Sequence, residues 1–203
     1  MGTATSIPGH RYRTDERGKF AVSQDTDRFE LVAAGFDRRV RAVPAGQWDA
    51  QSPCDDWKAR DVVAHVVTNY RSMAAQAMGG ASRPMGVDED PAEAWTDAYG
   101  QMQDLLGDPE MLSKTVSGPT GPTSVEQIVG ALVAMDTHIH TWDLARAVGG
   151  DDRLDPDVVR FARGIMEPMD EMIRRPGVFG PKLEPPAGAD EQTQLLYFLG
   201  RRA

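Results

Sequence analysis

The chain has 203 residues, 40% of them hydrophobic, which supports one domain with a substantial core rather than two full domains. Its formal net charge of −9 argues against nucleic acid or an anionic membrane surface as a partner, because binding to phosphate groups depends on Lys and Arg. No apolar run approaches the roughly 18 residues of a transmembrane helix, and the first residues lack the apolar core of a signal peptide. The single cysteine, Cys54, excludes an intramolecular disulfide and a multi-cysteine metal site. We therefore expect a soluble, cytoplasmic protein.

The beginning of the chain divides into a polar segment and an amphipathic one. Residues 1–26 lack sustained periodicity and are predicted to form a flexible N-terminal tail. From Asp27, apolar residues recur at steps of three and four, which predicts a helix ending near Pro44. A loop containing S-P-C-D-D-W follows. Cys54 is predicted to be a packing or loop residue there, because neighbouring aspartates raise the pKa of a thiol.

A second helix is predicted over residues 58–78, where valines form a broad apolar stripe. His65 lies on or beside this stripe, so its imidazole is expected to point toward the interior. A histidine in such a place is either a hydrogen-bonded core residue or a metal ligand. Asp61, one turn earlier, is either a partner of the second ring nitrogen or an acid favoured by the helix dipole. The residues alone leave both alternatives open.

The middle of the chain carries two clear helix starts. Asp90, followed by a proline, is predicted to cap a third helix that continues to Gly107. Residues 107–122 are rich in Gly and Pro and are predicted to be an irregular loop. Ser124 is predicted to cap the next helix, which runs to the glycine pair that begins at Gly149.

The last quarter of the chain is predicted to contain two further helices. One begins after the cap Asp155, reaches about residue 174 and is kinked at Pro168. A segment rich in Pro and Gly is expected to be irregular, and a short amphipathic helix over residues 190–199 closes the chain. Because strand alternation and repeats are absent from the sequence, the predicted fold class is all-α.

The longest helical pattern contains the stretch M-D-T-H-I-H-T-W-D-L-A-R-A, residues 135–147. Asp136 and His140 stand four residues apart, so their side chains lie one turn apart on the same helix face and can bind one metal ion. Asp143 follows on that face, either as a hydrogen-bonding partner of a ligand or as an ion-pair partner of Arg146. A third ligand has to come from another segment, and His65 is the candidate.

Three separated motifs together resemble a known family. They are S-P-C-D-D-W-K-A-R-D-V-V-A-H-V, D-T-H-I-H-T-W-D-L-A-R-A-V-G and A-D-E-Q-T-Q-L-L-Y-F-L-G-R. In this order they are similar to the mycothiol-dependent maleylpyruvate isomerase family of the DinB-like superfamily, specifically its short-chain branch with only the N-terminal metal-binding domain. The likeness covers residue 27 to the end of the chain.

The resemblance implies a DinB-like four-helix bundle over residues 27–203, with an additional C-terminal helix and a mostly irregular tail. It also implies a divalent metal, usually zinc, held by His65, Asp136 and His140. The isomerase uses a glutamate where this chain has Asp136. The isomerase also has a C-terminal domain for substrate handling, which a chain of this length lacks.

Two imidazoles and one carboxylate leave a divalent ion with a net positive charge and an open coordination position. A thiol bound there is deprotonated, whereas a bound water has its pKa lowered to about 7. The resemblance favours the thiol and implies mycothiol as cofactor. The leading hypothesis is a metal- and mycothiol-dependent thiol S-transferase or isomerase acting on a small electrophile, with Asp61 and Asp143 as candidate partners of the ligands. A non-catalytic metal-binding bundle, a metal-water hydrolase, a metal-free hydrogen-bond network and a homodimer remain open.

Overall fold

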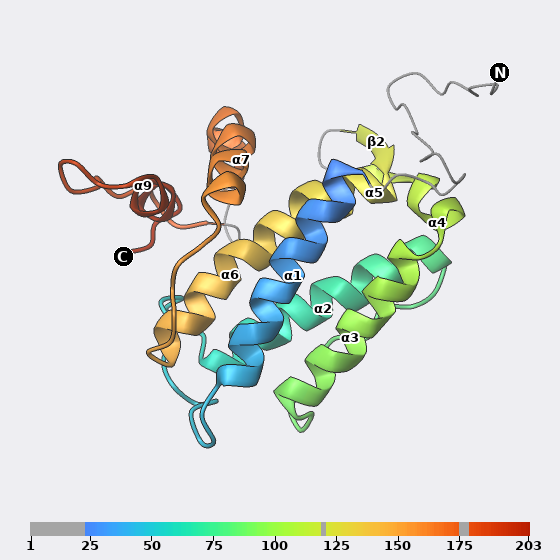
Figure 1. Cartoon of the computed structure of the whole chain (residues 1–203), viewed down its shortest axis with the longest axis horizontal. Coiled ribbons are helices and arrows are strands. Elements are labelled where there is room, and N and C mark those ends of the chain that lie inside the picture. Colours follow the sequence, from blue (N-terminus) through green and yellow to red (C-terminus); the bar gives the residue numbers. More distant parts are fainter. Residues whose placement is uncertain (1–22, 119–120, 175–178) are drawn as a thin grey trace, which may run out of the picture.

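A computed structural model describes residues 23–118, 121–174 and 179–203 of the chain (Figure 1). Residues 1–22, which make up most of the predicted flexible tail, lie outside the described part. None of the helices in the described ranges is long and apolar enough to cross a membrane.

Four long helices form the body of the molecule (Figure 1). They are α1 (Gln24–Ala42), α2 (Ala59–Met78), α3 (Pro91–Leu106) and α6 (Ala134–Ala147). Helix α1 packs against α3 and α6, and α2 also packs against α3 and α6, so the four helices enclose one core. The prediction of an all-α four-helix bundle is therefore confirmed.

The first and third helices begin where a side chain satisfies free backbone N–H groups. Ser23 Oγ accepts a hydrogen bond from the Thr26 N–H, so α1 starts three residues before the predicted Asp27. Asp90 caps α3 through the N–H groups of the second and third helical residues, as the sequence predicted. Capping residues therefore define these starts more accurately than the apolar period does.

The helix predicted from Ser124 is continuous, but it contains a local change of winding. Ser124 and Gln127 form a reciprocal capping box at the start of α5 (Val125–Ile128). A π-helical segment, Val129–Val133, then leads into α6. Within this segment, Gly130 allows close approach of α1, because a Cβ there would lie 2.2 Å from the Cβ of Asp25.

The prediction that residues 107–122 form an irregular loop is wrong. This region contains the short helix α4 (Pro109–Ser113) and an antiparallel hairpin of β1 (Thr115–Gly118) and β2 (Gly121–Ser124). Asp108 caps α4, and the β-branched start of β1 favours an extended backbone. Gly121 has a φ of +124°, a backbone conformation that favours glycine. This glycine is therefore compatible with the hairpin.

A second, smaller core lies on the outer side of α6. Helices α7 (Pro156–Met166) and α9 (Glu191–Phe198) pack together there, with apolar residues from α6 completing the cluster. Between them, a 3₁₀ turn over Glu167–Met169 interrupts the helix at the predicted proline and is followed by α8 (Asp170–Ile173). Residues 175–178 of the predicted irregular segment lie outside the described part.

Helix α6 is thus covered on two sides, and almost every residue from Ala134 to Ala145 is buried. The exception in this stretch is Asp136, whose side chain is 29% exposed. A buried helix that carries histidine, threonine and aspartate must satisfy these groups internally, because a buried polar group without a partner is costly. The polar contacts of α6 are therefore where the chemistry of the protein is expected.

Candidate metal centre

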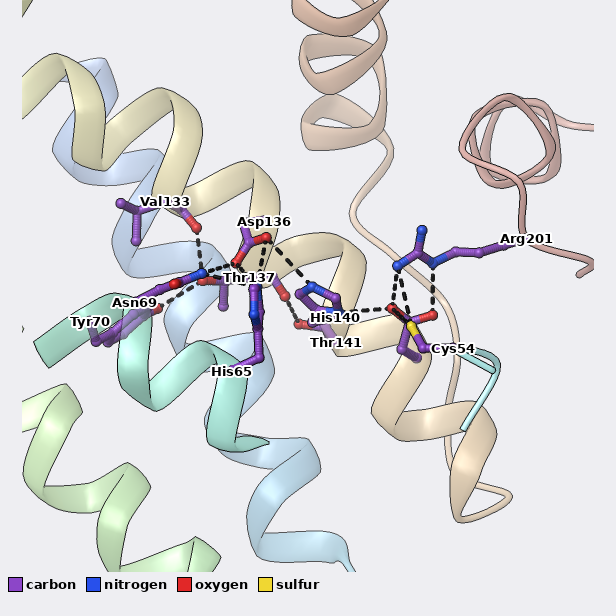
Figure 2. Close-up of polar contacts among 11 residues, drawn as sticks. Cys54, His65, Asn69, Tyr70, Val133, Asp136, Thr137, His140, Thr141 and Arg201 are labelled. Atoms are coloured by element: carbon purple, nitrogen blue, oxygen red, sulfur yellow. Dashed lines mark hydrogen bonds and ion pairs between the residues drawn. The ribbon is translucent and has the colours of Figure 1, made fainter. Parts of the chain in front are cut away.

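Three predicted ligands from two helices converge at one point (Figure 2). His65 projects from α2, and Asp136 and His140 project from α6. One potential ligand atom from each lies within 4.8 Å of those of the other two. The Nε2 atom of His65 is 3.3 Å from the Asp136 carboxylate, and the Nε2 atom of His140 is 3.5 Å from it. The structure thus brings together the trio that the sequence singled out from positions 71 residues apart.

The donor set fits a divalent ion that keeps an open coordination position. Two imidazole nitrogens and one carboxylate oxygen match the three protein ligands typical of catalytic zinc sites. The partial exposure of Asp136 and His65, 29% and 31% of their side chains, leaves this side of the trio accessible to small molecules. The geometry can therefore hold an ion and admit a further ligand.

The electrostatics of the trio are those of a strongly interacting group. Burial by itself would lower the pKa of His140, but the charge of Asp136 and hydrogen bonds to Asp136 and Asp143 raise that pKa to about 9. Burial would raise the pKa of Asp136, yet the two imidazoles outweigh it and hold the pKa well below its usual range. Without an ion, the proton held by His140 supplies positive charge beside Asp136.

Asp143 orients His140 from the opposite edge of its ring. Nδ1 of His140 lies 2.9 Å from Oδ2 of Asp143. Because an ionised carboxylate only accepts hydrogen bonds, Nδ1 is the donor, and Nε2 is left to face Asp136. Burial would raise the pKa of Asp143, but hydrogen bonds from His140 and Arg201 lower it to about 2. The predicted role of Asp143 as a partner of a ligand therefore has a direct geometric basis.

Arg201 binds Asp143 from the C-terminal end of the chain (Figure 2). Its Nε and Nη2 atoms donate to the two carboxylate oxygens at 2.8 and 2.7 Å, which is a bidentate pair. Both side chains are almost fully buried. The predicted alternative, in which Asp143 pairs with Arg146, is not observed, because Arg146 contacts Asp152 instead.

Cys54 lies beside the pair of Asp143 and Arg201 and is not part of the trio. Its Sγ lies 3.5 Å from Oδ2 of Asp143 and 3.6 Å from Nη2 of Arg201. Burial and the neighbouring Asp143 charge raise the pKa of the thiol to about 12, so it is protonated at neutral pH. Cys54, His140 and Asp143 lie close enough to bind an ion as well, but the guanidinium of Arg201 already supplies positive charge there. The packing role predicted for Cys54 agrees with this arrangement.

Asn69, one turn after His65 on α2, contacts two of the three candidate ligands. Its amide nitrogen lies 3.0 Å from Nε2 of His65 and 2.9 Å from Oδ2 of Asp136. Asn69 thus links His65 and Asp136 in a hydrogen-bond network that is complete without an ion.

Trp57 covers the two histidines from the loop before α2. Its ring centroid lies 4.9 Å from that of His65 and 5.5 Å from that of His140. The side-chain nitrogen of Gln51 lies 3.0–3.2 Å from four carbonyl oxygens of this loop, which fixes its path. The S-P-C-D-D-W loop thus positions Trp57 at the trio and Cys54 beside Asp143.

Asp61 and His138 lie apart from this arrangement. The Asp61 carboxylate accepts a hydrogen bond from the Lys58 N–H at 2.9 Å, which fits an acid at a helix start. His138 is buried on another face of α6, and burial lowers its pKa to about 4. Its Nε2 has no hydrogen-bond partner among the described residues. His138 therefore lies outside the trio of candidate ligands.

Sequence reasoning missed three contributors: Asn69, Trp57 and Arg201. Asn69 follows His65 at a spacing of four, which was a usable signal. Arg201 carried no local signal, because its partner lies 58 residues earlier in the chain.

The comparison with protein families decides the relationship of the chain. The family described as Mycothiol maleylpyruvate isomerase N-terminal domain matches residues 29–145, more than half of the chain. The chain belongs to this family. The matched span contains His65, Asp136 and His140, and it ends before Arg201.

Two similar proteins span most of the chain. Two uncharacterized proteins of Mycobacterium tuberculosis, MT0763 of strain CDC 1551 / Oshkosh and Rv0738 of strain ATCC 25618 / H37Rv, are each 29% identical to the chain over 174 residues. These matches cover 82% of this chain and 91% of each relative.

Two solved structures share the fold. The crystal structure of the mycothiol-dependent maleylpyruvate isomerase matches with a TM-score of 0.50 and 15% identity, and that of a histidine-to-alanine mutant of this enzyme matches with 0.52 and 14%. Each match covers 69% of this chain and 68% of the isomerase chain. At this level of identity the likeness shows the fold alone, which is the DinB-like helical bundle expected from the sequence.

Proposed function

We propose that the chain binds one divalent metal ion, with zinc as the leading candidate, through His65, Asp136 and His140. We further propose that it uses this ion in a mycothiol-dependent S-transfer or isomerisation of a small electrophile in the cytoplasm. The observation that carries the proposal is the convergence of the three ligand atoms within 4.8 Å, beside a partly exposed carboxylate. Family membership supports the thiol as the second component.

A bound divalent ion would supply the positive charge that keeps a coordinated thiol deprotonated at neutral pH. The residues of the chain do the positioning. Asp143 holds the Nδ1 proton of His140, so that Nε2 presents its lone pair to the site. Trp57 covers one side of both imidazoles and limits access of water from that side. The thiol and the electrophile would then meet on the exposed side of Asp136.

The identity of the electrophile is a separate question. The isomerase with the similar fold is named for maleylpyruvate, but the match covers about two thirds of that chain. Asp136 is one methylene shorter than the glutamate that the family resemblance implies at this position. We therefore propose the chemistry class, thiol transfer or thiol-assisted isomerisation, without assigning maleylpyruvate as the substrate.

Elemental analysis of the purified protein tests the metal part. We expect about one divalent ion per chain in the parent, and none in the double variant His65→Ala, His140→Ala. His138→Gln is the matched control, because His138 lies on the same helix but outside the trio. Absence of metal in the parent after incubation with zinc would refute the proposal and favour the hydrogen-bond network around Asn69.

Thiol consumption tests the catalytic part. The metal-loaded parent is incubated with mycothiol and a panel of small electrophiles, and the loss of free thiol is followed against the double variant. Metal-dependent consumption supports the proposal. Full metal occupancy without turnover would instead support a non-catalytic metal-binding bundle, and hydrolysis without thiol would support a metal-water hydrolase.

A further inference from the structure

A groove opens beside the candidate ligands, between α2 and α6. It has a volume of ≈ 360 Å³, and its lining includes Asp136 and Asn69. This volume lies in the range typical of small-molecule sites. The groove is therefore continuous with the trio and does not form a separate cavity elsewhere on the bundle.

Helical spacing explains why the groove extends away from the trio. Asn69, Ser72 and Gln76 follow His65 on one face of α2 at steps of three and four. They form a narrow polar edge. Along this edge the groove runs from Asp136 toward the π-helical segment before α6, where Leu132 contributes to its lining.

The rest of the groove is an apolar wall. It is formed by Met73, Leu132, Val133, Met135, Met166 and Phe179. Three of these six side chains are methionines, which are flexible and polarizable and adapt to ligands of different shape. Among the described residues that line the groove, Asp136 is the one charged group.

We propose that this groove binds the apolar body of a neutral electrophile, such as an aryl or alkyl enone, with its reactive carbon at the Asp136 end. That the bound molecule is an electrophile rests on the proposed function. In the metal-free protein, a carboxylate in this groove would lose water next to Asp136, and the described lining offers it no cation. Arg201 is engaged by Asp143 through two hydrogen bonds. The side chains of the lining by themselves therefore favour a neutral molecule over an acid of the same size.

Methyl NMR of the protein labelled with ¹³C at its methionine methyl groups tests this selectivity without any turnover. The probes are benzylideneacetone, which is neutral, and cinnamate, which has the same aryl-vinyl body and a carboxylate. Benzylideneacetone should shift the methyl signals of Met73, Met135 and Met166, assigned by single Met→Leu substitutions. The signal of Met102, buried in the bundle core away from this groove, should not move. To the metal-free protein, cinnamate should bind at least about tenfold more weakly than benzylideneacetone.

Two variants sharpen the assignment. Leu132→Ser removes part of the apolar wall at a half-buried position and should weaken benzylideneacetone about tenfold. Leu31→Ser, at an exposed leucine of α1 outside the lining, should leave its affinity unchanged. Gln76→Lys, at an exposed position on the groove edge, should strengthen cinnamate several-fold and keeps the test intact if Leu132→Ser does not fold.

Equal or tighter binding of cinnamate by the metal-free parent, or methyl shifts confined to other methionines, would overturn the inference. The titrations are run on both metal-free and zinc-loaded protein. If benzylideneacetone binds in the groove but the protein holds no metal, the groove proposal is supported and the metal proposal is refuted. If the protein binds metal but the methionine signals of the groove do not respond, the metal proposal is supported and the groove proposal is refuted.

Discussion

His140 stands between two polar clusters that differ in how their charge is balanced. On its Nδ1 side, Asp143 is fully buried and is paired with Arg201 by two short hydrogen bonds. On its Nε2 side, Asp136 is partly exposed and faces imidazoles and an amide, with no Lys or Arg in contact among the described residues. The cluster around Asp143 contains its own cation. The cluster around Asp136 instead has potential ligand atoms arranged for one. A divalent ion is therefore expected on the Asp136 side.

The largest effect should come from breaking the internally balanced cluster. Arg201→Met leaves the buried carboxylate of Asp143 without its counter-charge and should lower the free energy of unfolding by about 3–5 kcal/mol. Urea unfolding of the metal-free protein measures this effect. Arg202→Ala, at the exposed neighbour, should change stability by less than about 0.5 kcal/mol. Equal losses in both variants would show that the pair with Asp143 is not the cause.

The other cluster should respond to metal instead of to a protein cation. Zinc at about 100 times its dissociation constant should raise the free energy of unfolding by about 3 kcal/mol, because it binds the native state. A chelator should reverse the gain, as thermal unfolding with and without it would reveal. Zinc should raise the free energy of unfolding of Asp136→Ala only slightly. A full zinc effect in this variant would show that the ion binds at another site.

The pH dependence should have opposite signs with and without metal. The pKa of His140 is raised from 6.5 to about 9, so the stabilisation that its proton gives the metal-free protein is present below pH 6.5 and is lost as pH rises toward 9. Zinc must displace the same proton, so its affinity should increase about tenfold per pH unit from neutral pH toward this pKa. Zinc titrations against a competing chelator measure the slope. A pH-independent affinity would place His140 outside the coordination sphere.

The smallest effect on metal content and stability is expected at Cys54, which lies on the Asp143 side of His140. Because its thiol is protonated at neutral pH, Cys54→Ala should leave the metal content unchanged. The loss of a small half-buried group should cost about 1 kcal/mol of stability. Elemental analysis and urea unfolding test the two statements. Loss of the ion in Cys54→Ala would mean that the metal binds on the Asp143 side.

Local signals in the sequence were sufficient for several of the helix starts. The caps Asp90, Ser124 and Asp155 define helix starts in the structure, because each side chain accepts hydrogen bonds from N–H groups a few residues away. Local signals failed over residues 107–122. There, glycines that disfavour a helix were compatible with a hairpin, whose two strands are stabilised by pairing with each other.

The sequence by itself determined that Asp136 and His140 share one face of a helix, because a spacing of four in an α-helix leaves little alternative. It also determined that His138 faces elsewhere. Only the tertiary structure decided that His65 meets them, that Asn69 and Trp57 contact the trio, and that Arg201 neutralises Asp143. These contacts join residues from different elements, and their geometry depends on how the helices pack, which no local pattern of residues specifies.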